Sequence, residues 1–234
     1  MIAVVCAMQE ERDALLKMMD NVVKSQGKTL LYRGKILDNE YYQGHLEGKE
    51  IVLCRCGIGQ VYAAMSALLL IEKFKPELLI NLGCAGSLNE NVHVGDVVIA
   101  NRVGQWRIDV PGWERNIESL TCSFPCDEKV TVLFPLIDMD LKIHSGSIVS
   151  ADEFIYKNEQ VKEIKEHFPE ALCGEMEGYA IAAAAYALNV PCTIIRSISD
   201  ETLISGDYNS FYFNLEDVCN KAALLCKEII KRYK

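Results

Sequence analysis

Cys173-Gly-Glu-Met-Glu-Gly178 and Thr193-Ile-Ile-Arg-Ser-Ile-Ser-Asp200 flank a run of small apolar residues that predicts a helix over Gly178–Leu188. The second stretch begins with three β-branched residues, Thr193-Ile-Ile195, and predicts a strand over Thr193–Ile198. Strands that alternate with helices in this way are typical of α/β proteins with a mostly parallel, buried central sheet.

Three carboxylates, Glu175, Glu177 and Asp200, stand at the ends of these apolar elements. Desolvation opposes the charge of a buried carboxylate, so such residues are uncommon in a core without a partner. Each of them taken alone is equally well explained as a helix cap or an exposed strand end. Taken together, they indicate a site that handles protons or sugar hydroxyls.

The same alternation continues through the whole chain. Predicted strands are Ile2–Ala7, Leu30–Ile36, Tyr41–Leu46, Ile51–Cys56, Leu78–Leu82, Asp96–Ala100 and Ile143–Ser150. Further predicted helices are Glu10–Met19, Val61–Phe74, Asp127–Phe134, Glu159–Phe168 and Leu215–Tyr233. Three successive strands near the N-terminus predict a mixed sheet. We therefore expect one domain over residues 1–234, a three-layer α/β/α fold with a mixed, partly barrel-like central sheet.

Composition narrows the classes of partner. The 234 residues are 50% hydrophobic and carry a formal net charge of -9 without any basic block, which argues against nucleic acid or an anionic membrane surface. The opening Met1–Ala7 lacks a basic flank, so we interpret it as a core strand rather than a signal peptide. No apolar run approaches the ~20 residues that cross a bilayer.

Ten cysteines raise the alternatives of disulfides or a zinc site. Most of them lie inside apolar segments, no C-x-x-C pair occurs and the four histidines are scattered. We interpret most as small core residues in a reducing compartment, which predicts a cytoplasmic protein without a metal centre.

Small residues, carboxylates and one aromatic residue follow the predicted strands. Because ligands of open α/β sheets bind outside the carboxyl ends of strands, these residues should converge. Gly83-Cys-Ala-Gly86 can let main chain touch a flat ligand, although a tight turn explains it as well. Glu11 also suits the first turn of a helix, and Phe154 is either core or a base-stacking platform. One carboxylic acid and one carboxylate base are what cleavage of a glycosidic bond needs, so the set predicts a nucleoside site.

Seven short motifs together resemble the 5′-methylthioadenosine/S-adenosylhomocysteine nucleosidases of the nucleoside phosphorylase/nucleosidase superfamily. They are Ala7–Glu11, Gly57–Val61, Asn81–Gly86, Val94–Val98, Val149–Phe154, Glu175–Glu177 and Arg196–Asp200. The resemblance covers nearly the whole chain. It implies hydrolysis of methylthioadenosine and adenosylhomocysteine, and of 5′-deoxyadenosine, to adenine and the sugar, in methionine salvage. It implies no cofactor and a homodimer.

The resemblance also implies roles for individual residues. Glu11 would be the general base for water, with Arg196 placing that water, and Asp200 the acid that protonates adenine N7. Glu177 would hold the ribose hydroxyls beside Met8 and Met176. Further substrate-binding residues would be Cys84, Ala85, Gly86, Phe154 on the base, Ile155 through its main chain, Glu175, Ser199 and Phe211. Val110 and Trp113 would enter the 5′-pocket of the neighbouring subunit.

The sequence departs from the family pattern in three places. Cys84 stands where these nucleosidases usually carry Ser or Thr, Trp106 and Arg107 are foreign to the segment Gln105–Trp113, and an insertion over Glu201–Asn209 leaves open whether Phe211, Tyr212 or Phe213 lines the pocket. All three bear on the 5′-substituent or the water. Met8-Gln-Glu-Glu11 replaces the arginine motif with which the phosphorylase branch holds phosphate, which favours hydrolysis.

Two alternatives remain. One is a related enzyme with another 5′-preference, either a futalosine-type hydrolase or a phosphorylase. The other is a nucleoside-binding protein that has kept the fold and lost turnover.

Overall fold

The computed structural model describes residues 1–27, 40–107, 110–112, 122–201 and 215–234, together with the backbone of 30–32 and 35–37. The strands are β1 Ile2–Cys6, β2 Asp20–Gln26, β3 Leu30–Tyr32, β4 Lys35–Leu37, β5 Glu40–Leu46, β6 Lys49–Arg55, β7 Leu78–Ser87, β8 Val97–Gln105, β9 Ser123–Pro125, β10 Ile143–Ser150, β11 Ala171–Glu175 and β12 Cys192–Glu201. The helices are α1 Gln9–Leu16, α2 Gln60–Phe74, α3 Glu128–Thr131, α4 Asn158–His167, α5 Gly178–Ala187 and α8 Leu215–Arg232, with a 3₁₀ turn at Phe134–Leu136.

A mixed ten-stranded sheet runs through the described part of the chain in the order β11-β10-β8-β12-β7-β1-β6-β5-β2, with β9 paired to β8. β12 is parallel to β7 on one side and antiparallel to β8 on the other. The strand β11 pairs both with β10 and, in antiparallel fashion, with β7, so this half of the sheet closes on itself. The closure brings the ends of β7, β11 and β12 to one place and confirms the partly barrel-like sheet.

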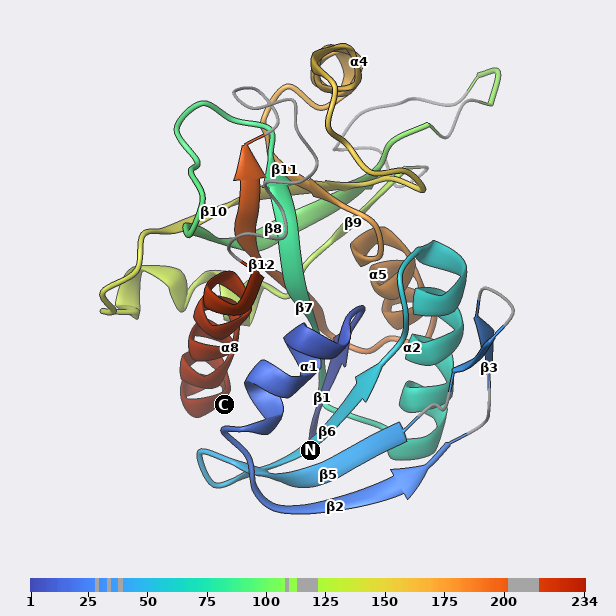
Figure 1. Cartoon of the computed structure of the whole chain (residues 1–234), viewed down its shortest axis with the longest axis vertical. Coiled ribbons are helices and arrows are strands. Elements are labelled where there is room, and N and C mark those ends of the chain that lie inside the picture. The colour runs from blue at the N-terminus through green and yellow to red at the C-terminus, as the bar shows by residue number, and fades with distance from the viewer. Residues whose placement is uncertain (28–29, 33–34, 38–39, 108–109, 113–121, 202–214) are drawn as a thin grey trace.

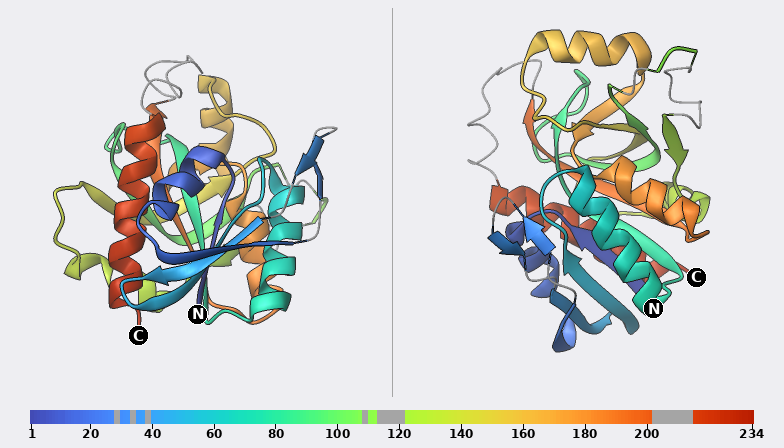
Figure 2. Two further views of the ribbon diagram at one scale, coloured as in Figure 1. Left: turned by 60° about the horizontal axis from the view of Figure 1, so that its bottom comes forward. Right: turned by 90° about the vertical axis from the view of Figure 1, so that its right-hand side faces the viewer.

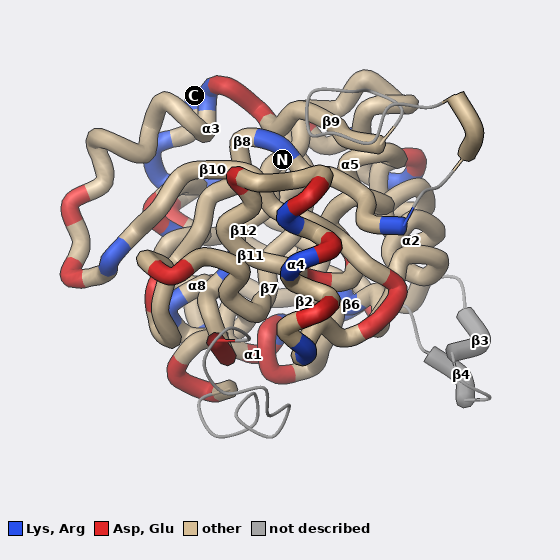
Figure 3. The backbone as a smooth tube through the Cα atoms, turned by 90° about the horizontal axis from the view of Figure 1, so that it is seen from above, with Lys and Arg blue, Asp and Glu red and all other residues tan. Residues whose placement is uncertain are grey.

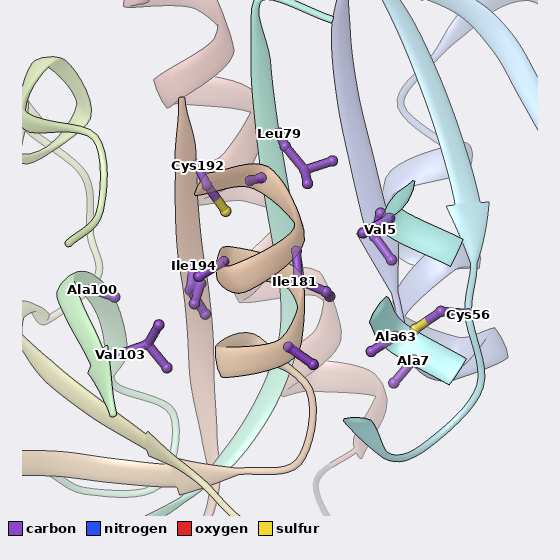
Figure 4. Packing of buried hydrophobic residues seen from close by; sticks show 14 of the residues in the cluster. Val5, Ala7, Cys56, Ala63, Leu79, Ala100, Val103, Ile181, Cys192 and Ile194 are labelled. Atoms are coloured by element: carbon purple, nitrogen blue, oxygen red, sulfur yellow. The ribbon is translucent and has the colours of Figure 1, made fainter. Parts of the chain in front are cut away.

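Helices cover the two faces of the sheet (Figures 1 and 2). The helices α1 and α8 pack on one face, where the core includes Leu15, Leu225 and Ile229. On the other face α2 and α5 pack together, with Ala63 and Ile181 among the buried residues (Figure 4). Small residues on α2 and α5 let both helices lie close to the strands. The helix α5 is almost wholly apolar and alanine-rich because most of its residues are buried in this packing.

The α/β class and the mixed sheet are confirmed, and the local predictions fail in three places. The single strand predicted over Leu30–Ile36 is wrong, because two strands, β3 and β4, pair antiparallel there. The short strand β9 was not predicted. Sequence reasoning also missed β2, a strand at the edge of the sheet that pairs with β5. Its residues are almost all exposed, so no buried alternation marks it in the sequence.

No helix among the described residues is long and apolar enough to cross a membrane. Lys and Arg alternate with Asp and Glu along the visible chain, as on α4 (Figure 3). Both chain ends lie away from α4 and from the carboxyl ends of β1 and β12 (Figures 1 and 2).

Candidate active site

A cavity of about 480 Å³ opens where the carboxyl ends of β1, β7, β11 and β12 meet. Predicted site residues in its lining are Met8, Glu11, Cys84, Ala85, Gly86, Phe154, Ile155, Glu175, Met176, Glu177, Ser199 and Asp200. The structure thus brings twelve residues from five separate segments to one cavity, as the strand-exit argument predicts. Lining residues that sequence reasoning missed are Ala7, Glu10, Ile58, Glu153, Tyr156, Gly174 and Leu215.

The Glu11 carboxylate is held by three main-chain donors. Its Oε2 accepts the N–H groups of Ala7 and Met8, both at 2.9 Å, and its Oε1 accepts the N–H of Cys84 at 3.0 Å. The first two bonds cap α1, so the helix-cap interpretation is correct for Oε2. The third bond reaches across to β7 and fixes the carboxylate in the cavity wall. Burial raises the pKa of Glu11, although Arg196 and the three N–H groups oppose the shift.

Arg196 and Glu175 form a buried ion pair beneath the cavity, each with a side chain 1% exposed. The guanidinium also donates to Asn81 Oδ1 and to the carbonyl of Ile195. Its Nη2 lies 3.9 Å from Glu177 Oε2. Arg196 itself is not among the lining residues, so the guanidinium affects the cavity through the carboxylates that it contacts or attracts.

Glu175 uses its carboxylate internally. It accepts from Arg196, from Ser150 Oγ, and from the N–H groups of Glu177 and Gly178 at 2.9 and 2.7 Å. Three of these donors go to Oε2, and only the Ser150 hydroxyl goes to Oε1. Glu175 thus caps α5 and pairs with Arg196 while it lines the cavity, and its contact with substrate stays a prediction.

Glu177 is the N-cap residue of α5, yet its side chain caps nothing there. Its Oε1 accepts the N–H of Gly59 at 2.8 Å, which gives the glycine turn after β6 a clear purpose. Gly59 has φ 102°, a conformation that favours glycine. Burial and the neighbouring Glu175 raise the pKa of Glu177, against the pull of Arg196.

Asp200 follows an irregularity in β12, where the register with β7 shifts between Ile198 and Asp200. Its Oδ1 lies 2.7 Å from Ser199 Oγ, which is also 3.2 Å from the carbonyl of Ala85. Burial raises the pKa of Asp200, and the Ser199 hydroxyl partly offsets the shift. Ser199 therefore lines the cavity and also orients the Asp200 carboxyl group, whose raised pKa favours its protonated form.

Phe154 is 36% exposed although its ring borders the cavity. A core phenylalanine would be covered by neighbours, so the core interpretation does not fit. Val110 is 40% exposed and is not among the lining residues of its own subunit. Trp113 and Phe211, with Tyr212 and Phe213, lie outside the described residues.

The Sγ atom of Cys84 lies 3.6 Å from that of Cys219 on α8. This contact and burial raise the pKa of the Cys84 thiol far above that of an ordinary cysteine, so it is neutral and a poor nucleophile. None of the ten cysteines is in a disulfide.

Comparison with known proteins places this geometry in a family. The model of the phosphorylase superfamily matches residues 1–233. A 5′-methylthioadenosine/S-adenosylhomocysteine nucleosidase of Desulfotalea psychrophila is 32% identical over 238 residues, covering 100% of this chain and 98% of the relative. The nucleosidase of Staphylococcus aureus is 35% identical, with 99% and 97% covered. The chain belongs to this nucleosidase family.

Solved nucleosidase structures have the same fold. The Streptococcus pneumoniae nucleosidase with the transition-state inhibitor MT-ImmA superposes with a TM-score of 0.86 at 32% identity, covering 100% of this chain and 99% of the other. The Neisseria meningitidis nucleosidase with methylthio-immucillin-A gives 0.84 at 33% identity, with 98% of each chain covered. A futalosine hydrolase of Helicobacter pylori gives 0.84 at 24% identity, a likeness of fold alone.

Replacing Arg196 by Met should destabilise this nucleosidase-family fold by about 3–5 kcal/mol, because it leaves buried carboxylates without their cation. Urea unfolding would measure the loss. Adding Glu175→Gln should recover part of the stability, since the amide still accepts the helix N–H groups. The control Lys221→Met breaks the exposed ion pair with Asp217 and should change the free energy of unfolding by less than about 1 kcal/mol. An equally small effect of Arg196→Met would contradict the central place given to the pair.

Proposed function

We propose that this chain hydrolyses the N-glycosidic bond of 5′-methylthioadenosine and S-adenosylhomocysteine and releases adenine. The observation that carries the proposal is the pair of buried carboxyl groups, Glu11 and Asp200, held in the wall of one cavity beside an exposed aromatic ring. Burial raises the pKa of both, which lets one act as base and the other as acid near neutral pH. The family of the chain supports the same activity.

The chemistry follows from these groups. Asp200, protonated, gives its proton to N7 of adenine while the bond between C1′ and N9 breaks and its electron pair stays on the base. Glu11, ionised, takes a proton from the water whose oxygen bonds to C1′. The positive charge that develops on the sugar lies near carboxylates, which stabilise it.

The remaining lining residues suit recognition of the nucleoside. We propose that Glu177 binds the ribose hydroxyls beside Met8 and Met176, because Gly59 leaves part of its carboxylate unoccupied. Phe154 would stack on adenine and the main chain of Ile155 would bind its edge. Ala85 and Gly86 would let the β7 backbone lie against the substrate, since neither has a bulky side chain.

Adenine release should not need phosphate. The cavity presents the Glu11 carboxylate where an anionic nucleophile would be repelled, and the buried Arg196 is already paired with Glu175. Methylthioadenosine, adenosylhomocysteine, 5′-deoxyadenosine and inosine would be incubated with the protein, with and without phosphate, and free base measured. We expect adenine from the first three under both conditions. Release that depends on phosphate would contradict hydrolysis, and binding without any release would favour the nucleoside-binding alternative.

Asp200→Asn should lower kcat by about 10²–10⁴-fold and leave adenine binding largely intact, because the amide cannot give up a proton.

In the native protein kcat/KM should fall as pH decreases through the raised pKa of Glu11, which must be ionised. It should also fall as pH increases through the raised pKa of Asp200, which must be protonated. A full pH profile with Asp217→Asn, an exposed residue of α8, as control would measure both limbs. A near-normal rate for Asp200→Asn would refute its role as the acid.

We also propose a homodimer. The α2 side chains Val61, Met65 and Leu68 are 68, 41 and 42% exposed and repeat at helical spacing, next to Ile58 at the cavity edge. Contiguous apolar stripes of this kind mark protein contacts. The exposed Val110 would enter the cavity of the partner subunit, which would complete the site for the 5′-group.

Val61→Glu combined with Leu68→Glu should convert the dimer to a monomer, because two charges would be desolvated in the contact. Light scattering after size exclusion would measure the mass. Val132→Glu combined with Leu136→Glu is a matched control, since these residues are 66 and 61% exposed on a different element. Retention of the dimer in the α2 variant would exclude this surface as the interface.

For the setting of the reaction, we propose the cytoplasm and a role in methionine salvage. Support comes from the ten cysteines, none of them bridged and all but Cys84 buried, which suit a reducing compartment.

A further inference from the structure

The segment Asp152–Lys157 carries Phe154, Ile155 and Tyr156, which line the cavity, yet it has no helix or strand. Its backbone is not part of a regular hydrogen-bond ladder, so side-chain contacts contribute to fixing its shape. Because two of these residues are proposed to contact adenine, whatever holds the segment also sets the geometry of base recognition.

Gln160 on the first turn of α4 is buried, 7% exposed, and reaches back to this segment. Its Oε1 accepts the N–H groups of Tyr156 and Lys157 at 3.0 and 2.9 Å. Its Nε2 donates to Glu153 Oε2 at 3.0 Å and to the carbonyl of Phe154 at 3.3 Å. One amide thus uses all four of its hydrogen-bonding positions on a single loop.

Capping of α4 explains only part of this arrangement. A cap at this position requires the bond to the N–H of Lys157, the N-cap residue. The other three bonds lead to Glu153, Phe154 and Tyr156, all of which line the cavity. The Gln160 amide therefore holds residues of the cavity wall in addition to capping the helix.

Arg107 approaches the same segment from the end of β8. Its guanidinium lies 4.3 Å from the centre of the buried Trp106 ring, and its Nε lies 3.2 Å from Glu153 Oε1. The side chains of Arg107 and Glu153 are 54 and 43% exposed, so solvent weakens this pair. Between the two supports, the buried Gln160 should dominate and Arg107 should contribute less.

We propose that Gln160 is a positioning residue that sets adenine affinity by fixing the main chain around Phe154. It touches no substrate atom and acts through the carbonyl of Phe154, the N–H of Tyr156 and the carboxylate of Glu153. The inference rests on the proposed function, because that function puts adenine against Phe154 and Ile155.

Gln160→Leu tests the inference by removing all four hydrogen bonds at similar volume. The dissociation constant of adenine, measured by calorimetry, and KM for methylthioadenosine should both rise about tenfold, with a smaller change in kcat. Arg107→Ala should raise them only about twofold, as expected for an exposed pair. An adenine affinity that Gln160→Leu leaves unchanged would overturn the proposal.

Two further variants separate positioning from loss of stability. Ile164→Val, in the buried core side of the same helix, should lower the thermal midpoint and leave adenine affinity unchanged. Gln160→Glu would set two carboxylates against each other and should weaken adenine binding. Adding Glu153→Gln to it should recover affinity, because an amide then again faces a carboxylate. Adenine affinity that merely follows the thermal midpoint across all variants would refute positioning.

The wild-type protein separates this inference from the proposed function. Adenine release by the wild type together with an unaffected Gln160→Leu variant would refute the inference alone. A wild-type protein that neither binds adenine nor releases it would refute both.

Discussion

One buried guanidinium organises the candidate site. Arg196 pairs with Glu175, lies 3.9 Å from Glu177 and attracts Glu11, so a single cation serves three carboxylates. One positive charge does not balance three carboxylates. Burial, the largest cause, raises the pKa of both Glu11 and Glu177. Without the cation three carboxylates could not share this volume. With it, Glu11 and Glu177 can line one cavity, which is where we propose a base and a ribose-binding carboxylate.

Gly83 makes this crowding possible. A Cβ atom at this position would lie 2.6 Å from Glu11 Oε1, closer than real Cβ atoms approach, and 3.1 Å from Arg196 Nη1, a tight contact. The strand β7 therefore passes close to the Glu11 carboxylate and the Arg196 guanidinium at a residue without a side chain. The barrel-like closure places Gly174 of β11 beside Gly86 of β7, a second close approach of backbones at the cavity floor. Packing thus requires the glycine at position 83, which neither the tight-turn nor the ligand interpretation had considered.

The sequence was sufficient to predict which segments meet, because apolar strands and the residues that follow them are local signals. It was not sufficient to divide roles within Glu175–Glu177. Glu175 accepts from Ser150, Arg196 and the start of α5, whereas Glu177 accepts the N–H of Gly59 and lies 3.9 Å from Arg196. The bonds to Ser150, Arg196 and Gly59 join segments far apart in the chain, so no spacing along the sequence reveals them. Gln160 was missed for a different reason, since a glutamine in the first turn of a helix looks like an ordinary cap.

The difference between main-chain and side-chain contacts also explains why Cys84 does not disturb Glu11. The contact to Glu11 comes from the N–H of residue 84, which every residue except proline supplies. The side chain turns instead to Cys219, and the two Sγ atoms lie 3.6 Å apart. A change from hydroxyl to thiol therefore leaves the anchor of Glu11 intact and alters only the wall beside it.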